Sequence, residues 1–255
     1  MLRVKKRLKI VPLGVVLLLV ALIIAANVWR GRSQVRSVRV DIDYCGADTL
    51  VTPQQVADLV LRSMPDITSQ RLRDVDLSQV AKAAVASPWL LRCEAGTSIG
   101  GTVVVHGVQH RPIVRVCSRN GEYYLDDRGY RVPVSAVGSA DLIVASGNIP
   151  PKGKGLRDVW TLASYLDGHE QLAPLFDQIY RDAKGDLFLT PKLGNHVVQI
   201  GPPDELDSKF VNLMAFYNNA LPQAGWETYR QISVKYRGQV VGQRNADGKL
   251  NSETF

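Results

Sequence analysis

The chain lacks the short motifs that mark the commonest enzyme and metal sites. Its 255 residues hold no Gly-x-Ser-x-Gly nucleophile turn, no phosphate-binding loop, no dinucleotide fingerprint and no zinc-protease motif. His106 and His110 would lie ~13 Å apart on an extended strand, so we expect them not to share a metal ion. Asp126 and Asp127 precede Gly129 in ordinary turn chemistry, and adjacent side chains of an extended chain point to opposite sides. We therefore predict a protein with no catalytic site, no cofactor and no metal ion.

Acidic residues are absent from the first 30 positions. This stretch carries six basic residues, namely Arg3, Lys5, Lys6, Arg7, Lys9 and Arg30. The whole chain has a net charge of +7, and the part beyond residue 30 is about neutral, with 25 basic and 24 acidic residues. A nucleic-acid-binding domain would be expected to keep a basic face of its own, so we exclude that class of partner.

Charges of either sign are absent from residues 10–29. As a helix rising ~1.5 Å per residue, this run would cross the ~30 Å hydrocarbon layer of a membrane. A cleaved signal peptide is the alternative, but its apolar region is usually only ~7–15 residues long, and no convincing cleavage site follows here. The basic cluster before the run predicts a cytoplasmic tail over 1–9 and puts the remainder of the chain outside. Arginines at 30, 32, 36 and 39 follow the run, so the predicted orientation rests on the denser cluster before it, which no acidic residue opposes.

Cysteine is scarce, with Cys45, Cys93 and Cys117 as the whole complement. The spacing fits neither a zinc site nor a Cys-x-x-Cys redox pair. An odd number leaves at least one thiol unpaired within the chain, and we interpret the three as small buried apolar residues. Whether Cys45 and Cys93 form a disulfide stays open at this point.

A first domain is predicted over residues 33–111. Thr52, followed by Pro53 and with Gln55 three positions on, has the pattern of a capping box, and Asp76 is the predicted cap of a second helix. The expected elements are a strand over 38–44, two helices beginning after these caps, and strands over 89–98 and 102–108 joined by Ile99-Gly100-Gly101. This β-α-α-β-β order buries two helices against one face of a small sheet, and it leaves an edge strand and the other face available to partners.

A second domain is predicted over residues 112–244, because Pro112 interrupts the preceding strand pattern and a meander begins there. We expect a mixed α+β domain built on an antiparallel sheet with flanking helices, followed by a flexible tail over 245–255. The expected elements are strands over 140–147, 178–181, 186–190, 196–200, 228–236 and 239–244, a helix over 156–166 and a helix from Asp204 that stops at Pro222. The apolar spacing of this last helix predicts an inward face of Leu206, Phe210, Leu213, Tyr217 and Leu221. Alternation in the strand over 228–236 predicts that Tyr229 faces away from Ile232, Val234 and Tyr236.

These residues also carry a resemblance to a known family. The pattern Gln-x-Arg-Pro-(Ile/Val)-x-Arg-Val from Gln109, then Gly-x-Tyr-Tyr-x-Asp-x-x-Gly from Gly121, resembles the FtsQ/DivIB family of bacterial cell-division proteins. A C-terminal block looks closely similar too, and consists of Lys209, Phe210, Phe216, Tyr217, Gly225, Trp226, Tyr229, Ile232, Val234, Tyr236, Gln239, Val240, Val241 and Arg244. Gln109 replaces the Glu of many members, and Gly242 stands where some relatives carry a larger residue.

The resemblance implies a fold and a function. It implies a single transmembrane helix, a POTRA domain over 33–111 and an FtsQ-type β-domain over 112–244. It also implies an essential-type, non-enzymatic protein of the inner membrane and division septum, a scaffold that binds FtsB- and FtsL-like coiled-coil proteins in the periplasm. Through its POTRA domain it would contact other divisome components and link early and late division proteins to septal wall synthesis. The alternatives are an exported cell-wall enzyme and a POTRA-type receptor for protein export or outer-membrane assembly, although such receptors usually repeat the POTRA unit.

The partner-binding edge is expected in the last two strands, by addition of a partner strand. The candidate residues are Tyr229, Ile232, Val234, Tyr236, Gln239, Val240 and Val241. Ile232 and Val234 are also interpretable as core residues, and for them we favour that alternative. Tyr236 is the strongest candidate, because it matches a family position implicated in partner binding and an aromatic ring with a polar tip suits an interface.

The charge pattern of the first 30 residues makes a testable prediction about topology. An alkaline phosphatase fused after Arg244 should be active in cells, because the enzyme needs the oxidising compartment outside the cytoplasmic membrane. An inactive fusion, or a mature N-terminus near Asn27, would show that residues 10–29 do not form an uncleaved anchor.

Overall fold

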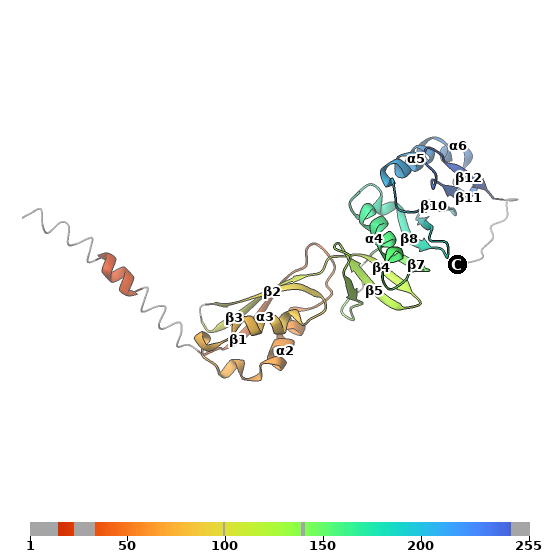
Figure 1. Ribbon diagram of the computed structural model, residues 1–255. Helices are drawn as coiled ribbons and strands as arrows, with labels where there is room; N and C mark the ends of the chain where they lie inside the picture. The colour runs from red at the N-terminus through yellow and green to blue at the C-terminus, as the bar shows by residue number, and fades with distance from the viewer. Residues whose placement is uncertain (1–14, 23–33, 99, 139–140, 246–255) are drawn as a thin grey trace, which may run out of the picture. The chain divides into compact units, whose positions relative to one another are not determined.

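The structure is a computed structural model that describes residues 15–22, 34–98, 100–138 and 141–245 (Figure 1). The chain forms two compact units. Residues up to Cys45 together with Val51–Gln109 form the first, and Gly46–Leu50 together with the chain from His110 onward form the second. The change from first to second unit falls close to Arg111–Pro112, where the sequence pattern put a domain junction.

Residues 15–22, inside the predicted membrane-spanning run, are helical. The described part of the chain contains no helix with the length and apolar character needed to cross a membrane. The rest of the predicted span over 10–29, the predicted tail over 1–9 and residues 246–255 of the predicted C-terminal tail lie outside the described residues.

The first unit has the predicted β-α-α-β-β order. Its elements are β1 (Ser37–Asp43), α2 (Pro53–Ser63), α3 (Leu77–Val85), β2 (Leu90–Ser98) and β3 (Thr102–Gln109), with short 3-10 turns at Pro65–Ser69 and Leu72–Asp74. The three strands lie in the order β1-β3-β2. Strand β1 runs parallel to β3, and β2 runs antiparallel to it. Strand β3 is therefore central, and β1 and β2 are both edges.

Both predicted helix caps are confirmed. The hydroxyl of Thr52 accepts a hydrogen bond from the Gln55 amide N–H at 3.3 Å, and the Gln55 side chain accepts one from the Thr52 amide N–H at 2.9 Å. The Asp76 carboxylate accepts from the amide groups of Ser78 and Gln79. These bonds satisfy amide groups that a helix start leaves without intrahelical partners. The apolar faces of the two helices then pack on the sheet in one core, which includes Val56, Val60, Val80, Ala84, Val103 and Val105.

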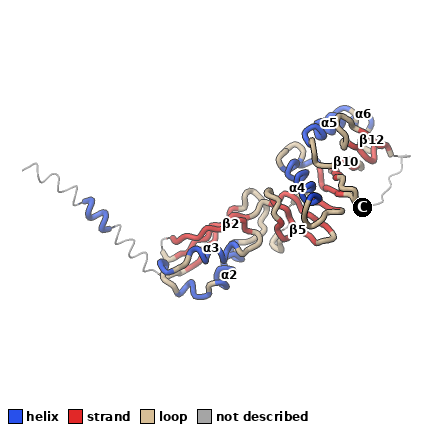
Figure 2. The backbone as a smooth tube through the Cα atoms, viewed as in Figure 1, coloured by secondary structure: helices blue, strands red, loops and turns tan. Residues whose placement is uncertain are grey.

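The second unit is a nine-stranded sheet with helices (Figures 1 and 2). The strands lie in the order β12-β11-β10-β9-β8-β7-β4-β5-β6. Their bounds are β4 Pro112–Ser118, β5 Gly121–Asp126, β6 Arg131–Pro133, β7 Val144–Gly147, β8 Phe176–Arg181, β9 Leu187–Pro191, β10 Val197–Gly201, β11 Tyr229–Ser233 and β12 Val241–Arg244. The helices are α4 Lys154–Asp167, α5 Leu206–Asn219 and α6 Leu221–Ala224, with a 3-10 turn at Ala173–Leu175.

The sheet is mixed, which corrects the expected antiparallel framework. Strand β7 pairs in parallel with both β4 and β8, and β10 pairs in parallel with β11. The other neighbours are antiparallel. Two neighbouring strands can run parallel only if a crossover connects them. Helix α4 makes this connection for β7 and β8, and helices α5 and α6 make it for β10 and β11. The α+β class is nevertheless confirmed.

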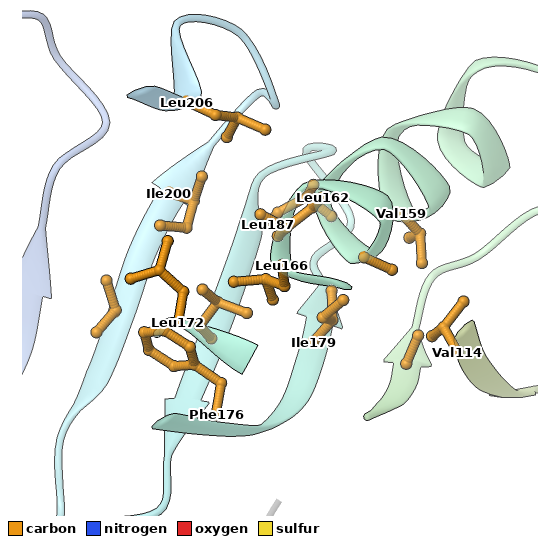
Figure 3. Packing of buried hydrophobic residues seen from close by; sticks show 14 of the residues in the cluster. Val114, Val159, Leu162, Leu166, Leu172, Phe176, Ile179, Leu187, Ile200 and Leu206 are labelled. Atoms are coloured by element: carbon orange, nitrogen blue, oxygen red, sulfur yellow. The ribbon is translucent and has the colours of Figure 1, made fainter. Parts of the chain in front are cut away.

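One face of this sheet carries the core. Figure 3 shows Val159, Leu162 and Leu166 of α4 lying over apolar side chains of the strands, among them Ile179 and Leu187. Buried and half-buried residues alternate along β9 and β10, so the opposite face keeps partly exposed side chains. Helix α5 adds Leu206, Phe210, Leu213 and Tyr217 to the same core, as the helical spacing predicted.

Several local predictions need correction. Helix α5 ends at Asn219, and Pro222 does not stop it but lies in the first turn of α6, where its missing N–H breaks no helical hydrogen bond. The strand expected over 140–147 is the shorter β7, and Ala140 lies outside the described residues.

The interpretation of all three cysteines as buried is wrong for Cys45. This residue is exposed, with a left-handed φ of 51° in the turn after β1. Cys93 packs against the first core, and burial raises the pKa of its thiol to about 11. Cys117 is half-buried and donates to Glu122 at 3.2 Å. None of the three cysteines, all of which the structure describes, forms a disulfide, so Cys45 and Cys93 are not joined.

Residues 46–50 lie between two stretches of the first unit but belong to the second. The Ser135 hydroxyl donates a hydrogen bond to the Leu50 carbonyl, and the Asp141 amide donates to the Asp48 carboxylate at 3.2 Å. The chain therefore contributes to the second unit twice, first with this five-residue loop and again from His110 onward.

Asp126 forms the centre of the turn between β5 and β6. Its side chain is buried and accepts hydrogen bonds from the amides of Arg128 at 3.0 Å and Tyr130 at 2.7 Å. His110 Nδ1 lies 2.7 Å from its other carboxylate oxygen, and the Trp160 indole donates to its backbone carbonyl at 3.0 Å. The predicted turn is confirmed, and this one residue also ties the turn to helix α4.

Replacing Asp126 tests that role, with Asp127 as the matched control. Asp126→Ala should lower the free energy of unfolding by about 3 kcal/mol or more, because it removes a buried carboxylate that holds two backbone amides and the His110 ring. Asp127 is exposed and its carboxylate lies 3.6 Å from Arg111, so Asp127→Ala should cost less than about 1 kcal/mol. Denaturant melts at neutral pH compare the two, and equal losses would contradict this assignment.

Candidate partner-binding edge

Strands β11 and β12 form one end of the nine-stranded sheet, and β12 is its outermost strand. They pair antiparallel, with Ile232 opposite Gly242 and Ser233 opposite Val241. Both are shorter than predicted. The chain leaves β11 after Ser233, and a turn follows in which the Gln239 amide donates to the Tyr236 carbonyl at 3.2 Å.

A bulge changes the predicted faces of β11. The register shifts between Tyr229 and Gln231, so Tyr229 and Ile232 both pack toward the helices. The Tyr229 ring meets Phe216 of α5 edge to face, with 5.4 Å between ring centroids. Gly242 makes room for this ring, because a Cβ there would lie 2.6 Å from a Tyr229 ring carbon. The prediction that Tyr229 faces away from Ile232 is therefore wrong, and a β-bulge is the physical reason.

The seven candidate residues fall into two groups. The side chains of Ile232 and Val234 are buried in the core, and Tyr229 and Val240 are partly buried against it. Tyr236, Gln239 and Val241 are exposed, with 63% of Tyr236 and 54% of Val241 accessible to solvent. Only this second group can offer side chains to a partner along the edge.

A chain of polar contacts that the sequence did not predict orders the residues before Tyr236. Lys235 Nζ donates to the Asp186 carboxylate at 2.7 Å, and the Gln199 side chain donates to the same oxygen at 3.1 Å. The side-chain amide of Gln231 donates in turn to the side-chain oxygen of Gln199 at 3.0 Å. The bond to Asp186 raises the pKa of Lys235. These contacts fix Lys235 and leave the neighbouring Tyr236 ring in solvent, 5.6 Å from its ammonium group.

An aromatic cluster holds the chain where it enters β11. Trp226 packs against Tyr217 of α5 with 5.6 Å between centroids, and His196 lies beside both rings. His196 Nε2 and the Tyr217 hydroxyl share a hydrogen bond of 2.8 Å. The other ring nitrogen, Nδ1, is buried and has no hydrogen-bond partner among the described residues. Burial lowers the pKa of His196, so the neutral imidazole is favoured in the folded protein.

These residues lie in the stretch 111–243, which matches the protein family described as FtsQ/DivIB, C-terminal related. The match covers more than half of the chain and all of the nine-stranded sheet except Arg244, the last residue of β12. The chain belongs to the FtsQ/DivIB family. A comparison with curated proteins found no match.

Membership of the FtsQ/DivIB family indicates a role in cell division. The stretch shared with this family includes the bulged strand β11, the exposed Tyr236 and most of β12. It also includes the His196, Tyr217 and Trp226 cluster and the contacts of Lys235. The resemblance found in the C-terminal block of the sequence is thus confirmed for the family, and the structure separates its supporting residues from its exposed ones.

The buried His196 predicts a pH dependence of stability. Its pKa is below the ordinary ~6.5 in the folded state, so the unfolded chain takes up the proton first as the pH falls. The contribution of His196 to the free energy of unfolding is therefore complete above pH ~6.5. It is lost toward lower pH, by at most ~1.4 kcal/mol per pH unit.

Unfolding free energies measured between pH 5 and 8 check this, with His196→Gln as the comparison. The amide keeps a hydrogen-bonding group beside Tyr217 but does not titrate. The variant should lose stability less steeply below pH ~6.5 than the natural chain. Parallel pH profiles would show that His196 is not responsible.

Proposed function

We propose that this protein is a non-enzymatic cell-division scaffold that binds a strand of its partner along β12. One observation carries the proposal: β12 is the outermost strand of the sheet, its residue Val241 is exposed, and exposed Tyr236 lies in the turn that precedes it. An edge strand presents unpaired backbone groups that another chain can bind, while exposed side chains give such binding its selectivity.

The two edges of the sheet differ in a way that supports this choice. The opposite edge, β6, is three residues long and ends in Pro133, which has no amide N–H to donate. The guanidinium of Arg131 in that strand lies over the Tyr123 ring, 3.7 Å from its centroid. Short length and proline are devices that protect an edge from other strands. Strand β12 contains no proline and exposes Val241, so the β12 edge is the better template.

The candidate residues then have different roles. Tyr236 and Val241 supply contact area to the partner, and Gln239 lies in the exposed turn beside them. Ile232 and Val234 anchor the edge from inside, since burial fixes the strand on the core. Tyr229 and Val240 support it through their partial burial. A pre-ordered edge lowers the entropy cost of binding.

The partners and setting that we propose are those that the family resemblance implies. We expect FtsB- and FtsL-like single-pass coiled-coil proteins as the ligands of β12, in the periplasm. The first unit, with its POTRA-like order of elements and two edge strands, would contact other divisome components. Residues 10–29 would anchor the protein in the inner membrane at the septum, with the N-terminus in the cytoplasm. The protein would thereby link early and late division proteins to septal wall synthesis.

Tyr236→Ala tests the edge, with Tyr130→Ala as the matched control. Tyr130 is 60% exposed, close to the 63% of Tyr236, but it adjoins the opposite edge strand β6. Loss of Tyr236 should weaken binding to the purified FtsB-like partner by about 2 kcal/mol, roughly 30-fold, while Tyr130→Ala should change it little. Val241→Pro should also weaken binding, because it removes a backbone donor from the strand.

Partner affinity and thermal melting are measured together on each variant. The proposal requires weaker binding with an unchanged melting temperature for Tyr236→Ala. Unchanged affinity would remove Tyr236 from the interface, and a sharply lower melting temperature would assign it to the core. Recovery of two small single-pass proteins in a pull-down from membranes would support the partner class, and recovery of outer-membrane precursors would favour an export receptor instead.

A further inference from the structure

A groove separate from the β12 edge lies between the end of α4 and helix α5. It has a volume of about 640 Å³, within the range of ligand-binding sites in proteins. Its walls come from the last turn of α4, the loop after it and one side of α5. The lining residues on α5 are Asp207, Phe210, Val211 and Met214, and Tyr165, His169 and Glu170 face them from α4 and the loop after it.

The floor of the groove is apolar and ordered. Three rings form a stack in which Tyr165 lies 4.2 Å from His169 and 5.2 Å from Phe210, measured between centroids. The Tyr165 hydroxyl donates to the Asp207 carboxylate at 2.8 Å, and the Tyr165 carbonyl lies 2.6 Å from His169 Nδ1. Burial, with the bond to Asp207, raises the pKa of Tyr165 to about 12. These contacts form the floor before any ligand arrives.

The most exposed apolar residue of the groove is on α5. Val211 has 68% of its surface accessible, more than any other large hydrophobic residue of the described chain. Met214 beside it is half-buried. Together with Asp207 they occupy positions i, i+4 and i+7 of the helix, which form a stripe along one face. A straight stripe of this spacing is the surface that a second helix meets in helix-on-helix packing.

The carboxylates that line the groove have no basic neighbour in its walls. They belong to Glu170 and Asp207, and the lining residues include no lysine or arginine. The last turn of α4, whose carbonyl groups carry partial negative charge, has no basic residue of its own. Arg111 pairs with Asp167 at that helix end but does not line the groove. Aromatic rings stacked between acidic groups attract a cation more strongly than either does alone.

We propose that this groove docks a cationic amphipathic helix of a partner protein. Apolar side chains of that helix cover Val211 and Met214, and an arginine or lysine lies between Glu170, Asp207 and the ring stack. The site is on α4 and α5, so it can be occupied independently of a strand bound at β12. A second docking surface would let the protein hold two partners, or two segments of one partner, at once.

Three synthetic peptides of about 14 residues test the charge requirement. Each carries leucines at helical i, i+4 and i+7 spacing, and the flanking positions are arginine, glutamine or glutamate. Binding to the full-length chain in detergent micelles is measured by fluorescence anisotropy at physiological ionic strength. The arginine peptide should bind at least 10-fold more tightly than the glutamate peptide, with the glutamine peptide between them. Equal binding of the three would overturn the proposal.

Matched substitutions locate the binding. Val211→Gln should weaken the arginine peptide about 5-fold or more, and Val85→Gln, at an exposed valine of α3, should not. Asp207→Asn keeps an acceptor for Tyr165 but removes the charge, so Asp207→Asn with Glu170→Gln should abolish the preference for arginine over glutamine. If none of these substitutions changes the affinity, the peptide binds elsewhere on the protein.

Two further measurements distinguish peptide binding in this groove from binding at the β12 edge and from self-association of the chain. Tyr236→Ala should leave peptide binding unchanged, so failure at the β12 edge and failure at the groove are distinguishable. Analytical ultracentrifugation of the natural chain and Val211→Gln tests whether a second copy of the chain covers the groove. A dimer that Val211→Gln dissociates would overturn the proposal in favour of self-association, and an unchanged monomer supports it.

Discussion

Strand β11 runs parallel to its neighbour β10, so the chain must return across the sheet between them. Helices α5 and α6 make that return, and the cluster of His196, Tyr217 and Trp226 marks its end. Because Val198 and Ile232 pair in this register, the apolar side of β11 meets the core. The antiparallel β12 pairs with the other side of β11 and is the outermost of the described strands. The open edge is thus a consequence of one parallel pairing and of the crossover that it requires.

Elements with local causes could be predicted from the sequence. Thr52 with Gln55, and Asp76, begin their helices through hydrogen bonds to amides two or three positions away, and such spacings are visible in a single sequence. Apolar periodicity likewise identified the buried side of α5. The same alternation favoured burial of Ile232 and Val234, which the structure places in the core. The family resemblance then pointed to the correct end of the chain.

Features with distant causes could not be predicted. The bulge beside Arg230 depends on how β11 and β12 align, and it turns Tyr229 to the helix side against strict alternation. Lys235 and Asp186 are 49 positions apart, and nothing in either neighbourhood indicates their contact. His110 and Asp126 meet because β4 and β5 pair, so the sequence, which set both residues aside as site candidates, did not predict the partly buried hydrogen bond between them. Parallel pairing of strands is equally invisible to local patterns.

The loop 46–50 bears on how this protein can be divided or recombined. A cut at the change of unit near Gln109 gives a C-terminal fragment without the carbonyl that Ser135 uses and the carboxylate that Asp141 uses. A chimera that exchanges only the contiguous C-terminal half therefore takes loop 46–50 from one parent, and Ser135 and Asp141, which bind this loop, from the other. The natural modules of this chain are discontinuous in the gene, and a faithful exchange has to move two segments together.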